Sequence, residues 1–128
     1  MNSKFRVWCL NNNEWEKDEI LINSSGLLFH RNIHGTLILL KSETHIVQHF
    51  TGVYDRFKKE IYEGDILKSH QGYLYVVVFY SCGFFIKPIL EDFEGYDLDL
   101  VHSQSALGAV VGNIFENKEL LVGIKKTF

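Results

Sequence analysis

One short segment of the chain combines aromatic and basic side chains in a pattern that suits binding. Residues 54–62 hold two tyrosines, a phenylalanine and three cationic side chains, namely Tyr54, Arg56, Phe57, Lys58, Lys59 and Tyr62. Small β-barrels hold peptides or nucleic acid with exposed aromatic and basic loop residues, because rings stack on flat groups and cations attract phosphates. Phe57 lies in a charged turn, where its burial is not assured. The alternative is that the rings pack inward and the lysines are solvated.

Four histidines form two pairs with a spacing of four residues, His30 with His34 and His45 with His49. On helices each pair would share one face and could bind zinc. Both pairs lie in segments with strand patterns, where this spacing separates side chains by about 13 Å. The four could converge only by cross-strand pairing, so we expect ordinary histidines, no metal site and no cofactor.

Carboxylates and lysines gather in the same middle region, as Lys58, Lys59, Glu60, Glu63, Asp65 and Lys68. A Mg²⁺-dependent nuclease needs two or more carboxylates around one metal ion, with a lysine nearby. Here the carboxylates are adjacent in one turn, and no second acidic strand points toward them. Asp65 is better explained as the turn residue that follows Gly64 and begins a strand.

The two cysteines, Cys9 and Cys82, are far apart in the sequence. Either could form a nucleophilic dyad with a histidine, but no flanking signature supports this. A cysteine in a β core behaves as a small hydrophobic residue, and in a reducing cytosol we expect both to stay reduced. The chain has no Gly-rich phosphate loop, no Gly-x-Ser-x-Gly and no Cys-x-x-Cys. We therefore expect no catalytic residues and no enzymatic activity.

An acidic segment, residues 91–99, carries five acidic residues and no basic one. It is the main source of the formal net charge of −3. The segment could contact a basic partner protein, bind Ca²⁺ weakly, or simply be solvated.

The composition favours strands as the elements that position these residues. Eleven isoleucines, ten valines and eighteen aromatic residues stand against two alanines. Branched and aromatic side chains suit a pleated surface better than a helix. Alternation and turn residues predict strands over 4–9, 19–22, 27–29, 36–40, 44–50, 73–80, 83–89 and 106–111. The expected fold class is all-β, with one helical turn at 118–121 and Asn117 as its N-cap.

The hairpin over residues 73–89 is the strongest part of this prediction. Val76–Phe79 is apolar on both faces, so its strand should be central and covered on both sides. The connecting loop, residues 81–83, is expected to contain three residues with Gly83 in the left-handed conformation.

Length and charge limit the class of protein. A chain of 128 residues is expected to form a single domain, 1–128, with a strand-rich N-terminal part, 1–50, and a barrel part, 51–128. No apolar run approaches 18 residues, and the start lacks an apolar signal segment, so we expect a cytoplasmic protein without membrane contact. The small negative charge offers no excess of positive charge to nucleic acid or lipid.

Three stretches of the chain resemble the YopX family. The opening residues 4–8 are similar to the start of many members, residues 48–55 and 59–66 resemble the central signature, and residues 112–117 and 119–121 resemble the C-terminal one. They occur in the family's order and span nearly the whole chain. Two positions differ: residues 56–58 replace the family's Asn-Gly turn, and Lys118 replaces a proline at the first helical position.

The resemblance implies a protein encoded by a bacteriophage or prophage, located in the bacterial host cell. It implies a small SH3-like barrel with an added N-terminal part, and no assigned enzymatic activity or established functional residue. Our first hypothesis is a non-enzymatic protein–protein adaptor that works as a small oligomer, because its apolar strands have edges to pair. The second is a nucleic-acid-binding module that uses residues 54–62. An enzyme is the third, and it would require a deep polar pocket.

Overall fold

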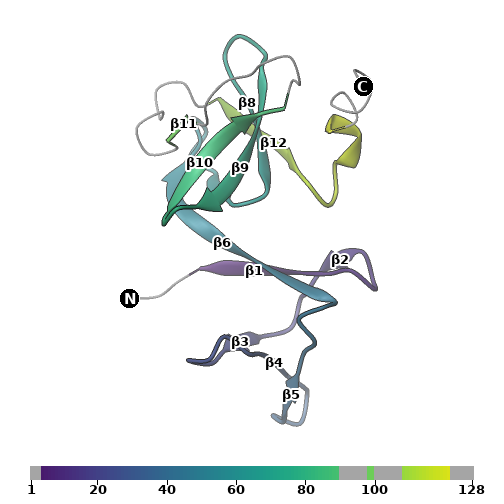
Figure 1. Cartoon of the computed structure of the whole chain (residues 1–128). Coiled ribbons are helices and arrows are strands. Elements are labelled where there is room, and N and C mark those ends of the chain that lie inside the picture. The colour runs from purple at the N-terminus through teal and green to yellow at the C-terminus, as the bar shows by residue number, and fades with distance from the viewer. Residues whose placement is uncertain (1–3, 90–97, 100–107, 122–128) are drawn as a thin grey trace. The chain divides into compact units, whose positions relative to one another are not determined.

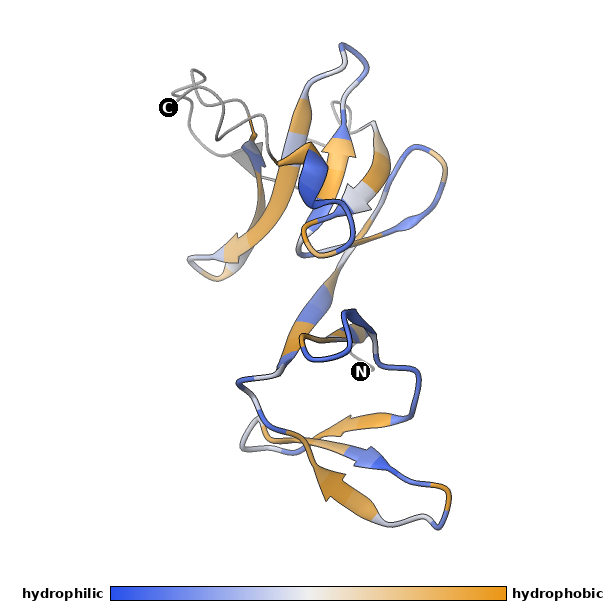
Figure 2. Ribbon diagram, turned by 90° about the vertical axis from the view of Figure 1, so that its right-hand side faces the viewer, coloured by the Kyte–Doolittle hydropathy of each residue, from blue (hydrophilic) through white to orange (hydrophobic). Residues whose placement is uncertain are grey.

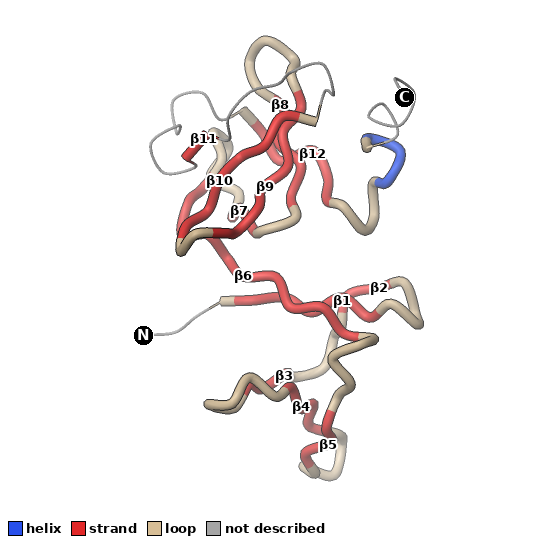
Figure 3. The backbone as a smooth tube through the Cα atoms, viewed as in Figure 1, coloured by secondary structure: helices blue, strands red, loops and turns tan. Residues whose placement is uncertain are grey.

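The regular secondary structure of the described chain is almost entirely strand, arranged in curled sheets that turns and loops connect (Figures 1 and 3). The computed structural model describes residues 4–89, 98–99 and 108–121. Within these, one 3₁₀ turn, η2 (Lys118–Leu120), is the only helix. The chain divides into two compact units, Met1–Gln48 and His49–Phe128, called unit 1 and unit 2 below. The all-β fold class is confirmed.

Unit 1 begins with a hairpin of strands β1 (Phe5–Cys9) and β2 (Glu14–Trp15). β1 lies between β2 and β6 (His45–Tyr54), a strand that begins in unit 1 and ends in unit 2. Trp8 pairs with Trp15 across the hairpin, with ring centroids 4.9 Å apart, and the Arg6 guanidinium lies 4.3 Å from the Trp15 ring. Side chains alternate along a strand, so Arg6 and Trp8 share one face of β1 while Val7 and Cys9 share the other.

The rest of unit 1 is a three-stranded sheet of β3 (Ile20–Ile22), β4 (Leu28–Arg31) and β5 (Leu37–Leu39) in that order. Its two hairpin loops are built alike. The side-chain Oδ1 of Asn23 accepts hydrogen bonds from two backbone N–H groups of its loop, and Asn32 Oδ1 does the same in the next loop. Each loop then has a glycine at positive φ, Gly26 at 84° and Gly35 at 79°, a conformation that glycine adopts without steric cost.

Unit 2 holds the larger sheet, whose strand order is β11-β10-β9-β8-β12. Its strands are β8 (Asp65–Lys68), β9 (Leu74–Tyr80), β10 (Gly83–Pro88), β11 (Leu98–Asp99) and β12 (Ala109–Asn113). β7 (Glu60–Tyr62) pairs instead with the end of β6. The core of this unit takes one buried residue from each of five strands: Val53, Ile61, Leu67, Val77 and Ile86. Closure of these strands into an SH3-like barrel stays a prediction.

Strand β9 is central, as predicted, but it is buried on one face only. Val77 is buried in the core, whereas Val76 and Val78 on the opposite face are only half-buried. Phe79, near the end of the strand, is 53% exposed, and its ring packs against Phe84 of β10 with centroids 4.8 Å apart. The second face is therefore covered only in part, because an apolar run gives no sign of how complete a second layer is.

Two loop predictions are also corrected. Gly83 pairs with Tyr80, so the β9–β10 loop has two residues, Ser81 and Cys82, at φ values of 48° and 62°. Two consecutive left-handed residues match the right-handed twist of a tight hairpin, and Gly83 is left in the strand. Asn117 precedes η2 but makes no side-chain capping bond, since its Oδ1 accepts from the backbone N–H of Asn113.

The predicted strands all have counterparts among the described residues, but three short strands, β2, β7 and β11, were not expected. β6 also extends to Tyr54, four residues past its predicted end at Phe50. Gly52, at φ 83°, marks an irregularity between Phe50 and Tyr54 through which the strand continues. The acidic residues 91–97 lie outside the described part of the chain.

No helix among the described residues is long and apolar enough to cross a membrane. Figure 2 shows hydrophobic residues concentrated along the strands and hydrophilic ones in most turns.

Candidate functional site

Asp55 organises the turn that follows β6. Its Oδ1 accepts hydrogen bonds from the backbone N–H groups of Phe57 (2.8 Å) and Lys59 (2.9 Å), and its Oδ2 accepts from that of Val110 (3.0 Å). The turn closes with Lys58 N–H donating to the Asp55 carbonyl at 2.9 Å. The turn is therefore pinned to β12 by a single buried carboxylate.

The environment of Asp55 keeps its carboxyl ionised. Burial acts to raise the pKa of this group. The three backbone hydrogen bonds and the nearby charge of Lys59 act in the opposite direction and outweigh burial, so the pKa lies below its ordinary value of 3.8. An ionised Asp55 is the state that can accept all three bonds.

Lys58 holds the turn in a conformation that lysine seldom adopts. Its φ is 66°, in the left-handed region, at the position where Gly26 and Gly35 stand in the two loops of unit 1. The departure from the family's Asn-Gly thus leaves a turn in place but gives it a strained residue. The side chain of Lys58 is exposed.

This turn presents an aromatic ring and cations to solvent. Phe57 is 67% exposed, and the Arg56 guanidinium lies 4.8 Å from its ring centroid. Arg56 Nη1 also donates to His70 Nδ1 at 2.9 Å. Neither Lys58 nor Lys59 forms a direct ion pair with any residue that the structure describes. We call Arg56, Phe57, Lys58 and Lys59 the turn patch.

The two tyrosines of the predicted site belong to the β6–β7 ladder rather than to the turn. Tyr54 is 51% exposed, and its ring lies 5.5 Å from that of Phe50, which lies 5.6 Å from that of Tyr62. Tyr62 is half-buried, and its hydroxyl donates to Glu60 at 3.3 Å. The predicted residues thus comprise the turn patch and two tyrosines that form an aromatic row with Phe50, in which Tyr54 is exposed and Tyr62 is half-buried.

A second candidate region is the β3–β5 sheet of unit 1, which exposes large apolar residues on both of its faces and which sequence reasoning missed. Its large exposed apolar residues, called the apolar sheet below, are Ile22, Leu27, Ile33, Leu37, Ile38 and Leu39. Ile33 is 95% exposed and Leu39 is 56% exposed. The sequence offers one sign of this region, since residues 37–39 are apolar without alternation. That pattern is typical of a strand buried on both faces, so it does not predict exposure.

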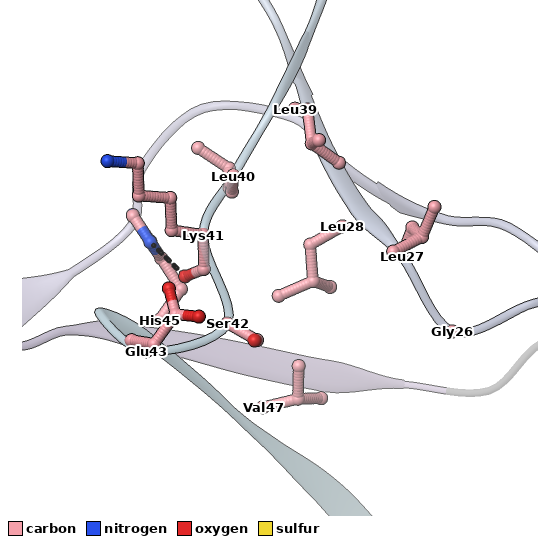
Figure 4. A pocket seen from close by; sticks show the side chains of 10 residues that line it. All are labelled: Gly26, Leu27, Leu28, Leu39, Leu40, Lys41, Ser42, Glu43, His45 and Val47. Atoms are coloured by element: carbon pink, nitrogen blue, oxygen red, sulfur yellow. Dashed lines mark hydrogen bonds between the residues drawn. The ribbon is translucent and has the colours of Figure 1, made fainter.

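Beside this surface, unit 1 contains a pocket of about 360 Å³. Its lining is mainly apolar, from Leu27, Leu28, Leu39, Leu40 and Val47, with Lys41, Ser42, Glu43 and His45 at one end. Figure 4 shows Leu28 and Val47 facing the same space. Apolar pockets of this kind accept a side chain or a small ligand.

The structure does not bring the four histidines together. His30 lies 3.8 Å from Asp18 and His45 lies 3.2 Å from Glu16. Among the described residues, the one group of three potential metal ligands is Cys9, Glu16 and His45. Glu16 was not singled out in the sequence, because six residues, which include a turn, lie between it and Cys9.

The carboxylates considered for a nuclease serve the local backbone instead. Asp65 begins β8, as predicted, and is buried, with Oδ2 accepting from Tyr62 N–H at 2.8 Å. Glu63 accepts from the backbone N–H of His49 at 3.1 Å.

Comparison with known proteins agrees with this architecture. A family model described as YopX protein matches residues 4–122. Among solved structures, the crystal structure of protein EF1440 from Enterococcus faecalis superposes with a TM-score of 0.62 and 26% sequence identity. The similarity covers 94% of this chain and 99% of that one. No protein with a curated description matches.

Proposed function

The chain belongs to the YopX family, and from this premise we propose that it is a phage- or prophage-encoded accessory protein that acts by binding another protein. The proposed role is that of a non-enzymatic adaptor in the bacterial host cell. In unit 2 we take the curled strands to form the SH3-like barrel expected for the family.

The observation that carries this proposal is the exposed apolar sheet of unit 1. Leu37 and Leu39 share one face of this sheet, and exposed apolar surface is typical of interaction sites because each buried square ångström contributes about 25 cal/mol. All three residues of β5 are exposed. Exposure of this apolar strand to water raises the free energy of the protein, and a partner that covers the strand removes this cost.

β5 is also an edge strand, and this suggests how the partner binds. Among the described strands, β5 pairs only with β4, through Phe29↔Leu39 and Arg31↔Leu37. Its other edge offers backbone groups to a strand from a partner protein. Leu39 also lines the apolar pocket, so a partner side chain next to that strand can anchor there.

The test is capture of partners by the tagged full chain from the bacterial host after prophage induction, with nuclease added. We expect a discrete protein to be retained, and to be lost in the double variant Leu37→Glu, Leu39→Glu. The matched control is Phe79→Glu, which changes an equally exposed apolar residue in unit 2. Equal retention by both variants would refute the role of the apolar sheet, and light scattering of the purified chain would identify a second copy as the partner.

A nucleic-acid-binding module is the second candidate, and the turn patch favours it. An exposed ring flanked by three cations is the arrangement that stacks on a base and contacts phosphates. Binding of single-stranded DNA or RNA should weaken steeply with salt. It should be lost in the double variant Lys58→Glu, Lys59→Glu and kept in Lys41→Glu, whose lysine is exposed in unit 1.

A further inference from the structure

Three side chains that can bind a metal ion meet in unit 1. They are the thiol of Cys9, the carboxylate of Glu16 and the imidazole of His45, and their ligand atoms all lie within 4.8 Å of one another. Cys9 is buried, and the side chains of His45 and Glu16 are 11% and 19% exposed. The cluster is therefore largely shielded from water, where an ion is held more strongly than at an open surface.

Strand pairing explains why residues so distant in sequence meet. The backbone N–H of Glu16 donates to the carbonyl of Val7 at 2.8 Å, which places Glu16 opposite Val7. Cys9 is two residues from Val7 and therefore on the same face of β1. His45 is the first residue of β6, the strand on the other side of β1. Strands β1 and β6 and the residue that follows β2 thus each direct one ligand to a common point.

The hydrogen bonds of His45 leave its second nitrogen facing a carboxylate. Nδ1 lies 2.8 Å from Thr44 Oγ1, which can donate or accept, and 3.1 Å from the carbonyl oxygen of Lys41, which can only accept (Figure 4). The other ring nitrogen, Nε2, lies 3.2 Å from Glu16 Oε1. In the tautomer that donates from Nδ1 to Lys41, the lone pair of Nε2 lies beside the Glu16 carboxylate, where one metal ion can bind both.

We propose that unit 1 binds one Zn²⁺ ion through Cys9 Sγ, a Glu16 carboxylate oxygen and His45 Nε2. Zinc accepts sulfur, nitrogen and oxygen ligands together, with bonds of about 2.0–2.3 Å. Tetrahedral bonds of that length put N and O ligand atoms about 3.3 Å apart, close to the observed His45–Glu16 distance, and sulfur about 3.6 Å from either. A small change of side-chain rotamer closes the remaining gap.

The surroundings of the cluster fit zinc further. Metal-bound histidines usually donate their other ring N–H to a carbonyl or carboxylate, and Lys41 supplies that carbonyl here. Zinc binding displaces the thiol proton of Cys9 to solvent and leaves the fourth position to water. An ion at this point ties β1, β6 and the residue after β2 together, so it stabilises the sheet of unit 1.

Titration of the metal-free full chain with Zn²⁺ and, separately, Co²⁺ tests the proposal. We expect one ion per chain, and a Co²⁺ complex with thiolate-to-metal charge-transfer absorption and the visible bands of a tetrahedral site. Cys9→Ser and His45→Gln should abolish the charge-transfer absorption and weaken Zn²⁺ binding by more than about 100-fold. A loss of this size exceeds the effect of removing a residue that only holds a metal ligand in place. Cys82→Ser and His34→Gln are the matched controls, since both change exposed residues, and they should bind as the unchanged chain does.

A direct hydrogen bond from His45 to Glu16 without a metal ion is the alternative, and it predicts no stoichiometric metal binding. That result would overturn the proposal, as would Co²⁺ absorption that survives Cys9→Ser or disappears in Cys82→Ser. If Cys9→Ser or His45→Gln fails to fold by circular dichroism, Glu16→Gln decides instead, because it keeps the shape of the side chain. It should weaken Zn²⁺ binding about 10-fold or more while the thiolate absorption remains, and unchanged affinity would refute the site.

Discussion

The core of unit 2 and the β3–β5 sheet of unit 1 use the same kinds of apolar residue with opposite results. In unit 2, Ile61 and Ile66 are completely buried. In unit 1, Ile33 is 95% exposed and all of β5 is exposed. Five strands contribute to the core of unit 2, whereas β5 is the edge of a sheet of three. Burial of these residues therefore depends on how many strands can cover a face of the sheet, rather than on hydrophobic content.

The largest expected difference between the two regions is in the loss of stability when one apolar side chain is truncated in each. Ile61→Ala should lower the free energy of unfolding by about 2–5 kcal/mol, because it leaves a cavity in the core of unit 2. The matched change Leu39→Ala in unit 1 should cost less than about 1 kcal/mol, because its side chain is already in water. Urea denaturation of the two variants measures both. Equal losses would mean that β5 is covered in solution.

A second comparison between the units concerns the loops in which the side chain of Asp55 or Asn32 accepts hydrogen bonds from backbone N–H groups. Asp55→Ala should lower the free energy of unfolding by about 2–3 kcal/mol, because it leaves buried backbone N–H groups without an acceptor. Asn32→Ala removes the same kind of acceptor from an exposed loop of unit 1, where water replaces it, and should cost about 0.5–1 kcal/mol. Thermal unfolding measures both, and a reversed order would contradict the role assigned to Asp55.

The lowered pKa of Asp55 makes part of this stability depend on pH. The folded protein binds fewer protons at this site than the unfolded chain does, so stability rises with pH through this range. The contribution is fully present above the unfolded pKa, close to 3.8, and is lost as pH falls through the lower, folded value. Acid unfolding followed below about pH 5 should therefore be steeper for the unchanged chain than for Asp55→Asn. Identical acid profiles would contradict this prediction.

The smallest expected effect concerns Lys58 and its counterpart in unit 1. Lys58→Gly should stabilise unit 2 by about 0.5–1 kcal/mol, because glycine adopts the left-handed conformation without the steric cost paid by lysine. The reciprocal change Gly35→Lys should destabilise unit 1 by about 1–2 kcal/mol. Both are measured by urea denaturation. A destabilising Lys58→Gly would show that the lysine side chain itself supports the turn.

Local features of the chain were predictable where a few neighbouring residues decide them. The strands at β1 and β8–β10 follow from alternation and β-branched residues, and Asp65 begins its strand as expected. The position of the β9–β10 loop was predicted but its two-residue form was not, because a tight turn with positive φ at Ser81 and Cys82 is dictated by strand twist rather than by those residues' own preferences. Within the predicted binding segment, the sequence pointed to Phe57 as an uncertain case for burial, and the structure exposes it.

By itself, the sequence determined that this protein is all-β, where most of its strands and turns begin, and which family it resembles. These depend on side-chain shape and spacing over a few residues. Only the tertiary structure decided that Cys9, Glu16 and His45 meet, that Tyr54 and Tyr62 form a row with Phe50, and that the apolar residues of β5 face water. Those outcomes depend on which strands pair and how many layers cover them, and strand pairing is a property of the whole chain.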